Sequence, residues 1–462
     1  MKSAFLGLSG SKTMVNRIAS ARNRLLRDKV GGCERAENLL WIFDHNAIPS
    51  DMAGNARQFD HATHLKRYEW HAVIFATPFN RKTRTFNRSV SWRTPILRQL
   101  EHGVPFTWVY TLAYSGDGVL RYLNMVSYLI LSTCAGLRRP GPQVVLGSSP
   151  HLLTGLAALL VAKRYRVPFV LEVRDLWPDT LIDLGLTNPL VIRPLLMLER
   201  LLYKSASHIV PVSNGIHTRI RGKGVLPSML TLIPNAPIQA QAPRRPGRDA
   251  LRARLGWSDK VVFIYSGAHG IANALDNVVA ADRLLDTDSR ALLVLLGDGP
   301  EKPRLMANSA DLENLVFLPS VPSSEVQAYI EAANVGIVSL RASGVFEDVI
   351  PNKLIDYVIA GLPVVTTVPG ESWRMIQKAN AGLLAEPGNP GDLAAAIERL
   401  ARDNDLRQTL ANNAWIYAKT LPTRADTAKS LATVLDGVMN NQHGVIDKAS
   451  ANAASFVPER NT

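Results

Sequence analysis

The sequence of 462 residues predicts an α/β protein with two doubly wound domains of parallel sheet, and three observations support this fold class. The chain is too long for one ordinary hydrophobic core, so two domains are expected. Short, strongly apolar runs alternate with helical segments in both halves, which is typical of buried parallel strands. Prolines recur between residues 234 and 246, where a sheet interior would exclude them, so this segment is predicted to be a hinge.

The predicted strands and the hinge set the domain boundaries. A strand in "NLLWIFDHNAIP" opens an N-terminal domain over residues 38–233, and "KVVFIYSGAHG" opens a C-terminal domain over residues 247–440. The last helix of the second domain is available to pack back on the first. Residues 1–37 form a basic extension before the first strand, and the polar residues 441–462 are expected to be a disordered tail.

The composition is that of a globular protein with a large positive charge. Hydrophobic residues make up 47% of the chain and charged residues 20%, and the formal net charge is +13. Such a charge suits nucleic acid, an anionic membrane surface or phosphorylated ligands. Nucleic acid is disfavoured because the basic residues are scattered and no stacking motif or zinc pattern appears. The two cysteines, Cys33 and Cys134, suggest no disulfide framework, so a reducing, cytoplasmic location is expected.

One apolar segment, Tyr122–Leu137, is flanked by Arg121 and by Arg138 and Arg139. It falls short of roughly 18 apolar residues, the length of a spanning helix. It could lie in a membrane interface, anchored by its basic ends on an anionic leaflet, or it could be a core helix. Peripheral attachment to the inner face of the plasma membrane follows only from the first of these two interpretations.

Two glycine-rich turns follow predicted strands of the C-terminal domain. "YSGAHG" holds Gly267, His269 and Gly270, and "LLGDGPEK" holds Gly297. Glycine lets the backbone approach a ligand closely, and a helix expected to begin near Ala272 would favour a phosphate at its N-terminus. Neither turn is a P-loop or a dinucleotide fingerprint, and each is also compatible with an ordinary tight turn.

Two segments of the N-terminal domain combine polar residues with a strand end. "EVRDLWPD" places Arg174 and Asp175 beside two further acids, a composition that favours a binding or catalytic edge. "PSDMAGNARQFD" turns through Gly54 and Asn55 into a helix with Arg57 in its first turn. An ordinary strand–helix connection explains this second segment equally well.

The strongest local argument concerns Lys353. Pro351 is expected to start a helix, which puts Asn352 and Lys353 in its first turn, where the helix dipole disfavours a cation. An anion held between the lysine and the helix amides would explain this arrangement. Asp356 lies one turn beyond Asn352 on the same face, where its carboxylate could accept hydrogen bonds from ribose hydroxyls.

In this order, these segments resemble the retaining glycosyltransferases of the GT-B fold, family 4. The resemblance spans roughly residues 39–435 and is closest to the WbuB-like enzymes of bacterial O-antigen and exopolysaccharide assembly. The motifs that carry it are "EVRDLWPD", "VSNGI", "LIPNAP", "YSGAHGIANALD", "LLGDGPEK" and "IPNKLIDYVIAGLPVV". The family fold implies two Rossmann-like domains that face a central cleft, with the acceptor on the N-terminal domain and the nucleotide-sugar on the C-terminal domain.

The resemblance implies a set of donor-binding residues. In the family pattern, Gly267 and Gly270 border the diphosphate and Lys353 pairs with it, while Phe317 and Leu318 offer backbone to the base. We therefore expect the donor site to be formed by Gly267, His269, Gly270, Gly297, Phe317, Leu318, Asn352, Lys353 and Asp356.

The catalytic and acceptor residues depart in part from the family pattern. The paired acids of the family have seven residues between them, which selects Asp348 and Asp356, although the adjacent Glu347 could take the first role. Many members carry a histidine where this chain has Arg174 and Asp175, and a Gly-Gly loop where it has Gly54 and Asn55. The catalytic candidates are Asp348, Glu347, Lys353 and Asp175, and the acceptor candidates are Gly54, Asn55, Arg57 and Arg174.

These residues imply a retaining glycosyltransferase that needs no cofactor and, in the absence of a placed Asp-x-Asp motif, no metal. The expected donor is a nucleotide-sugar, most simply a UDP-sugar. The expected acceptor is a glycan or a polyprenyl-diphosphate-linked oligosaccharide of bacterial surface polysaccharide. Two alternatives stay open at this point, a GT-B-like sugar-nucleotide epimerase and a non-catalytic nucleotide-sugar-binding homologue.

Overall fold

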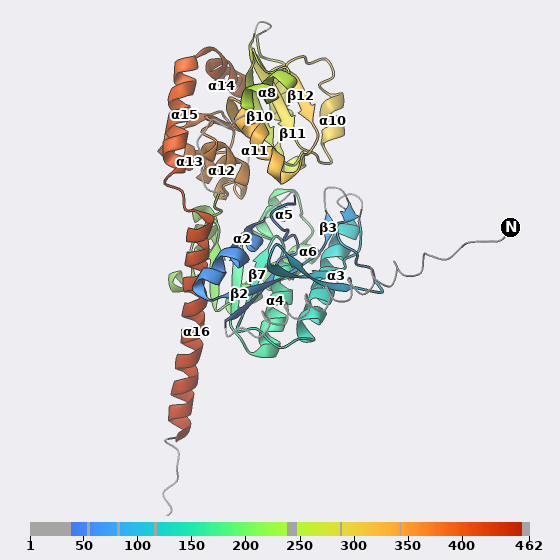
Figure 1. The fold of residues 1–462 in the computed structure, drawn as a ribbon, viewed down its shortest axis with the longest axis vertical. Helices are drawn as coiled ribbons and strands as arrows, with labels where there is room; N and C mark the ends of the chain where they lie inside the picture. Colours follow the sequence, from blue (N-terminus) through green and yellow to red (C-terminus); the bar gives the residue numbers. More distant parts are fainter. Residues whose placement is uncertain are drawn as a thin grey trace, which may run out of the picture.

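The computed structural model describes residues 38–52, 56–80, 84–114, 118–237, 247–286, 289–341 and 343–454. It contains two α/β domains, each built on one parallel sheet, and the C-terminal domain stands above the N-terminal domain in Figure 1. The basic extension 1–37 and most of the proline-rich hinge lie outside the described residues.

The N-terminal domain has a seven-stranded sheet in the order β5-β6-β2-β1-β7-β8-β9. β5 runs antiparallel to β6, and the other neighbouring strands run parallel. Each parallel strand is an apolar run buried on both faces, as the sequence pattern predicts. The strands are β1 (Leu39–Phe43), β2 (His71–Ala76), β5 (Ile96–Glu101), β6 (Val104–Val109), β7 (Val144–Ser149), β8 (Phe169–Val173) and β9 (His208–Pro211), with a small hairpin of β3 (Phe79–Asn80) and β4 (Thr85–Phe86) beside them.

Helices cover both faces of this sheet. One hydrophobic cluster unites the sheet with α3, α4, α6 and α7, and a second unites it with α2 and with the last helix of the chain, α16. The helical elements are α2 (Arg57–His64), η1 (Leu65–Tyr68), α3 (Val119–Leu137), α4 (Leu152–Tyr165), α5 (Asp179–Asp183), α6 (Pro189–Ser205), α7 (Asn214–Gly222) and η2 (Pro227–Met229).

The C-terminal domain has a six-stranded sheet in the order β12-β11-β10-β13-β14-β15, with all neighbouring strands parallel. The order turns back at β10, the first strand, which is the topology of a doubly wound sheet. The strands are β10 (Val261–Ser266), β11 (Ala291–Leu296), β12 (Leu315–Leu318), β13 (Val335–Val338), β14 (Val364–Thr366) and β15 (Gly382–Leu384).

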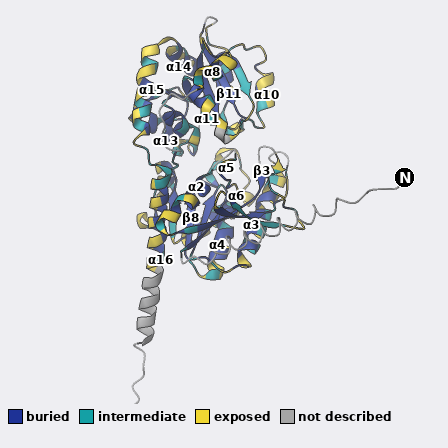
Figure 2. Cartoon of the chain, in the orientation of Figure 1, coloured by how far each residue is buried: buried dark blue, intermediate teal, exposed yellow. Residues whose placement is uncertain are grey.

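Two hydrophobic clusters lie on the two faces of the second sheet, and Figure 2 shows buried strands between helices with exposed outer surfaces. The helical elements are α8 (Arg248–Arg254), η3 (Ile271–Asn273), α9 (Asp276–Asp282), α10 (Lys302–Ala307), α11 (Ser323–Ala332), η4 (Phe346–Asp348), α12 (Asn352–Ile359), α13 (Glu371–Ala379), α14 (Pro390–Arg402), α15 (Asn404–Ala418) and α16 (Arg424–Ala454).

The last helix, α16, leaves the C-terminal domain and runs along the N-terminal domain (Figure 1). Leu431, Ala432 and Leu435 are buried in the same cluster as residues of α2 and the first sheet. The helix continues to Ala454, so the tail expected to be disordered from residue 441 is helical in its first part. Residues 441–454 contain several alanines and no proline, which permits this continuation.

The apolar segment Tyr122–Leu137 belongs to α3, which has one buried face and one exposed apolar face. One face of α3, which includes Met125 and Tyr128, is buried against the domain. The opposite face exposes large apolar side chains, among them Val126 and Ile130. Among the described residues, no helix is both long enough and apolar enough to cross a membrane.

Candidate functional site

The two glycine turns of the C-terminal domain pack directly on each other at the ends of β10 and β11. The amide of Gly267 donates to the carbonyl of Leu296 at 2.9 Å, and the amide of Gly297 donates to the carbonyl of Leu318 at 3.1 Å. Both glycines have φ in the range that favours glycine, and a Cβ on Gly297 would come within 3.0 Å of the Gly267 carbonyl. The backbone thus brings three neighbouring strand ends together at one edge of the sheet.

Gly270 differs from these two glycines. A Cβ placed on it would meet its nearest neighbour, Asn273, only at 3.7 Å. Neither packing nor backbone conformation therefore requires glycine at this position. A bare backbone in open space is what close approach of a ligand would need.

Lys353 points from α12 toward the first glycine turn. Its Nζ lies 3.7 Å from the centre of the Tyr265 ring and 3.3 Å from Oδ1 of Asn273. A Cβ on Gly267 would lie 3.2 Å from the same nitrogen. Burial lowers the pKa of Lys353 to about 7, so an anion beside it would stabilise its charged form. The lysine and the glycine turn predicted to hold a diphosphate are thus neighbours.

The expected helix N-terminus near Ala272 is not found. A short 3₁₀ turn, η3, occupies Ile271–Asn273, and α9 begins only at Asp276. Ala274 adopts a left-handed conformation with φ of 46°, which interrupts the helix. Positive charge at this turn therefore comes from Lys353 and from individual amides rather than from a long helix dipole.

His269 occupies the interior of the turn. Its ring is fully buried near the rings of Tyr265 and Phe317, with centroids at 5.9 and 6.1 Å. Burial lowers its pKa to about 4, which keeps the ring neutral at pH 7. Its backbone links the two turns, since its amide donates to Asp298 and its carbonyl accepts from Glu301. The residue shapes the turn by packing, and neither ring nitrogen has a hydrogen-bond partner among the described residues.

The backbone of Leu318, which was expected to face the base of the nucleotide, forms hydrogen bonds within the protein. The carbonyl of Leu318 accepts from Nζ of Lys302 at 2.9 Å and from the amide of Gly297. Lys302 also donates to the carbonyl of Gly297 at 2.8 Å. Lys302 thereby fixes the second glycine turn to β12, a role that the sequence analysis missed although "LLGDGPEK" contains this lysine.

Asn352 and Asp356 face a different space from Lys353. Both line a cavity of about 180 Å³ between the domains, together with residues of α2, the hinge and α16. Burial raises the pKa of Asp356 to about 6, with the charge of Arg424 opposing this shift. The described lining consists of Ser50, Met52, Ala56, Arg57, Asp60, His61, Asn235, Ala236, Pro237, Asn352, Ile355, Asp356, Arg424 and Thr427.

Arg57, expected at the acceptor, is anchored inside the N-terminal domain. Its Nε donates to Glu172 at 2.8 Å, and its terminal nitrogens donate to the carbonyls of Ile233 and Pro234. Burial alone would raise the pKa of Glu172, but the charge of Arg57 helps to hold it at about 2. Arg57 thus ties α2 to β8 and to the chain before the hinge, which a local sequence pattern could not reveal.

The other residues of the N-terminal domain that were predicted to act in catalysis or acceptor binding differ in their surroundings. Arg174 donates to the buried carboxylate of Asp44 at 2.9 Å, so this guanidinium is also engaged inside the domain rather than open to an acceptor. Asp175 is exposed at the end of β8. Gly54 and Asn55 lie outside the described residues.

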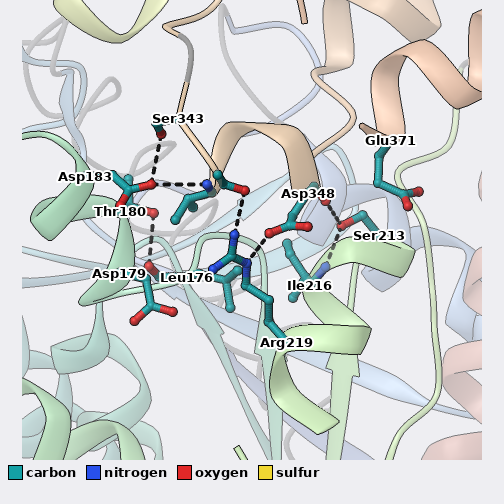
Figure 3. Close-up of polar contacts among 12 residues, drawn as sticks. Leu176, Asp179, Thr180, Asp183, Ser213, Ile216, Arg219, Ser343, Asp348 and Glu371 are labelled. Atoms are coloured by element: carbon teal, nitrogen blue, oxygen red, sulfur yellow. Dashed lines mark hydrogen bonds and ion pairs between the residues drawn. The ribbon is translucent and has the colours of Figure 1, made fainter. Parts of the chain in front are cut away.

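The adjacent acids Glu347 and Asp348 differ in their surroundings, and Figure 3 shows those of Asp348. The carboxylate of Asp348 forms an ion pair with Nε of Arg219, and its backbone carbonyl accepts from Oγ of Ser213. Glu347 is exposed, and a Cβ on Gly370 would come within 3.0 Å of its backbone. Arg219 was not among the predicted site residues, and no local motif marks it.

Two known protein families match the chain. Residues 56–236 match the family of the glycosyl transferase 4-like domain, and residues 260–403 match the family of glycosyl transferases group 1, so the two matches cover most of both domains. The chain is similar to WcaI of Escherichia coli K12, described as a colanic acid biosynthesis glycosyl transferase, with 27% identity over 64% of this chain and 74% of that protein.

Two solved structures share the fold. Sucrose-phosphate synthase from Thermosynechococcus elongatus superposes with a TM-score of 0.69 and 16% identity, covering 88% of this chain and all of that one. Anabaena HepE in complex with UDP-glucose superposes with a TM-score of 0.64 and 15% identity, covering 87% and 99%. With both domains matched in sequence and in fold, the chain belongs to family 4 of the GT-B glycosyltransferases.

Proposed function

We propose that the protein transfers a sugar from a UDP-sugar to a glycan acceptor of bacterial surface polysaccharide, with retention of configuration. The observation that carries the donor assignment is the position of Lys353, whose Nζ lies beside the first glycine turn. The UDP-glucose held by HepE and the colanic acid role named for the E. coli protein support this donor and this class of product.

Departure of the nucleoside diphosphate is the step that these residues would assist. Negative charge grows on the leaving phosphate while positive charge develops at the anomeric carbon. A protonated Lys353 and the amides of the glycine turns would stabilise the former. The acids of the loop before α12 would stabilise the latter, and the acceptor would attack on the face that the diphosphate leaves. The proposal requires neither a metal nor a cofactor, and full activity in excess chelator is the result expected.

Replacing Lys353 tests the donor assignment. Lys353→Ala should lower the rate of transfer by about 100-fold or more, the scale of losing one strong charge-stabilising donor. Lys378→Ala, which removes an exposed lysine of α13, is the matched control and should leave the rate unchanged. Turnover of the first variant near that of the unaltered protein would refute the assignment.

The two alternative functions give other results. Product formed from donor without acceptor would favour an epimerase, and UDP binding without turnover on any acceptor would favour a non-catalytic homologue.

The acceptor that we propose is linked to a polyprenyl diphosphate and is reached at an anionic membrane surface, the cytoplasmic face of the plasma membrane. The exposed side of α3 carries apolar residues at helical spacing, Val119, Tyr122, Val126 and Ile130, and α6 adds Leu190, Met197 and Leu201. Both helices contact α4, which places them on one side of the N-terminal domain. Exposed basic side chains, those of Arg138, Arg193, Arg200 and Lys204, accompany this apolar face.

Flotation with vesicles tests the membrane assignment. The protein should float with vesicles that contain anionic lipid, and the double substitution Val126→Glu and Ile130→Glu should abolish this binding because it places charge on the apolar face. Ile416→Glu is the matched control, since Ile416 is an exposed apolar residue on α15 of the other domain. Failure of the unaltered protein to float, or equal flotation of the double variant, would contradict membrane docking.

A further inference from the structure

The loop that carries the two adjacent acids is attached to the opposite domain. Ser343 donates through Oγ to the carboxylate of Asp183 at 2.9 Å, and the amide of Val345 donates to the same carboxylate at 3.1 Å. Asp183 ends α5 of the N-terminal domain. We call the segment from Ser343 to Val349 the acid loop, because it contains Glu347 and Asp348. Figure 3 shows Ser343 and Asp348 of this loop beside Asp183, Ser213 and Arg219 of the N-terminal domain.

An apolar contact reinforces this attachment. Val345 is only 2% exposed, and it is buried in a core cluster of the N-terminal domain rather than in any cluster of its own domain. Val212 and Ile216, at the end of the first sheet and in α7, belong to the same cluster. The acid loop thus contributes to the core of a domain from which it does not come.

Arg219 of α7 holds the acid loop at two points. Its Nε forms the ion pair with the Asp348 carboxylate, and its terminal nitrogen donates to the carbonyl of Gly344 at 2.6 Å. Ser213, the N-cap of α7, donates to the carbonyl of Asp348 while its oxygen accepts from the amide of Ile216. One helix, α7, therefore holds Asp348 at both ends, with Ser213 at its N-cap on the backbone and Arg219 in its last turn on the carboxylate.

Gly215 makes the close approach possible. A Cβ on this residue would come within 3.0 Å of the Asp348 backbone, so any side chain would push the acid loop away from α7. Gly222, at the other end of the same helix, has open space around it. The "VSNGI" motif is thereby explained by a contact between domains.

We propose that Arg219 is a positioning residue that acts through Asp348. It sets the acid loop in its working place only when the two domains are closed. The donor turns and Lys353 belong to the C-terminal domain alone, so binding of UDP does not require this contact. Turnover does require the contact between α7 and the acid loop, because the acids reach their working geometry only when α7 holds the loop in place. This inference rests on the proposed transfer function.

Two variants that break the contact by different means test the proposal. Arg219→Ala removes the ion pair, and Gly215→Ala displaces the loop backbone without any change of charge, whereas Gly222→Ala is the matched control. For both test variants, the UDP dissociation constant measured by calorimetry should stay within about twofold, while kcat at saturating donor should fall at least about tenfold. Arg219→Lys should recover part of kcat, since it restores the cation beside Asp348 but cannot make the ion pair and the hydrogen bond to Gly344 together.

Two further measurements separate positioning from other roles. In an Asp348→Asn background, Arg219→Ala should cause little additional loss of kcat, because the arginine acts through that carboxylate. Small-angle X-ray scattering should show a larger radius of gyration for Gly215→Ala than for Gly222→Ala. Fully additive losses of kcat, or an unchanged radius of gyration for Gly215→Ala, would overturn the proposal. Because scattering needs no substrate, it decides the domain contact even if the transfer assay fails in the unaltered protein.

Discussion

Lys353 combines two properties that seldom occur together, a place in the first turn of a helix and a half-buried amine. Both destabilise the charged lysine, the helix dipole by repulsion and burial by loss of water. Its neighbours offer partial compensation, through the Tyr265 ring and one amide oxygen of Asn273. A diphosphate beside the glycine turns would supply the missing negative charge. The residue is therefore poised to change its protonation state when the donor binds.

UDP binding should accordingly take up protons at alkaline pH. Because the pKa of Lys353 is about 7 in the free protein, the amine is mostly neutral at pH 8, and a bound diphosphate raises that pKa. We expect uptake of up to about one proton per UDP at pH 8 and little uptake at pH 6, where the amine is already charged. Calorimetry in two buffers of different ionisation enthalpy measures the uptake. Lys353→Met should abolish it, and equal uptake at both pH values would contradict the assignment.

At the scale of elements, α12 and β10 are joined by one tyrosine. The amide of Ser266 donates to the hydroxyl of Tyr357 at 2.8 Å, just before the first glycine turn. The ring fits because β13 carries glycine beside it, where a Cβ on Gly336 would come within 3.0 Å of the ring. The helix that presents Lys353 and the turn that faces it are thereby fixed to each other.

Tyr357→Phe should loosen this junction. It leaves the buried amide of Ser266 without this acceptor, which should destabilise the C-terminal domain by about 1–2 kcal/mol and weaken UDP binding several-fold. Urea unfolding and calorimetry measure the two effects. Tyr329→Phe, in a tyrosine of α11 that packs edge-on against Trp257, is the matched control. Unchanged UDP affinity in the first variant would show that the junction does not shape the turn.

The local pattern of the sequence predicted most of these elements but not their partners. Apolar runs between helical segments predicted the strands, and Pro351 correctly marked the start of α12. The helix expected after the first glycine turn does not form there, because Ala274 adopts a left-handed conformation and only a 3₁₀ turn precedes it. The contacts of Arg57 could not be predicted for a different reason, since its carboxylate partner is 115 positions away in the chain. The contact between Arg219 and Asp348 could not be predicted for the same reason, because the two residues are 129 positions apart.

At the scale of the whole molecule, the chain crosses between the domains twice, once through the hinge and once at the start of α16. Arg424 opens α16 and forms an ion pair with Asp60 of α2 at 2.7 Å. Asp356 of α12 lines the cavity between the domains together with Arg424, and the charge of Arg424 opposes the rise that burial causes in the pKa of Asp356. One cation therefore lies between carboxylates of both domains at the second crossing.

Removal of this cation should destabilise the molecule in a way that depends on pH. Burial raises the pKa of both Asp60 and Asp356 to about 6, and Arg424 opposes this rise. Arg424 stabilises only the ionised carboxylates, so its contribution is present above about pH 6 and is lost as the pH falls and the carboxylates become protonated. Arg424→Gln should lower the free energy of unfolding by about 1–3 kcal/mol at pH 8 and by much less at pH 5. Chemical denaturation at the two pH values measures the difference, with Lys429→Gln on the exposed side of α16 as the control. An equal loss at both pH values would mean that Arg424 acts by packing its aliphatic stem rather than through the two carboxylates.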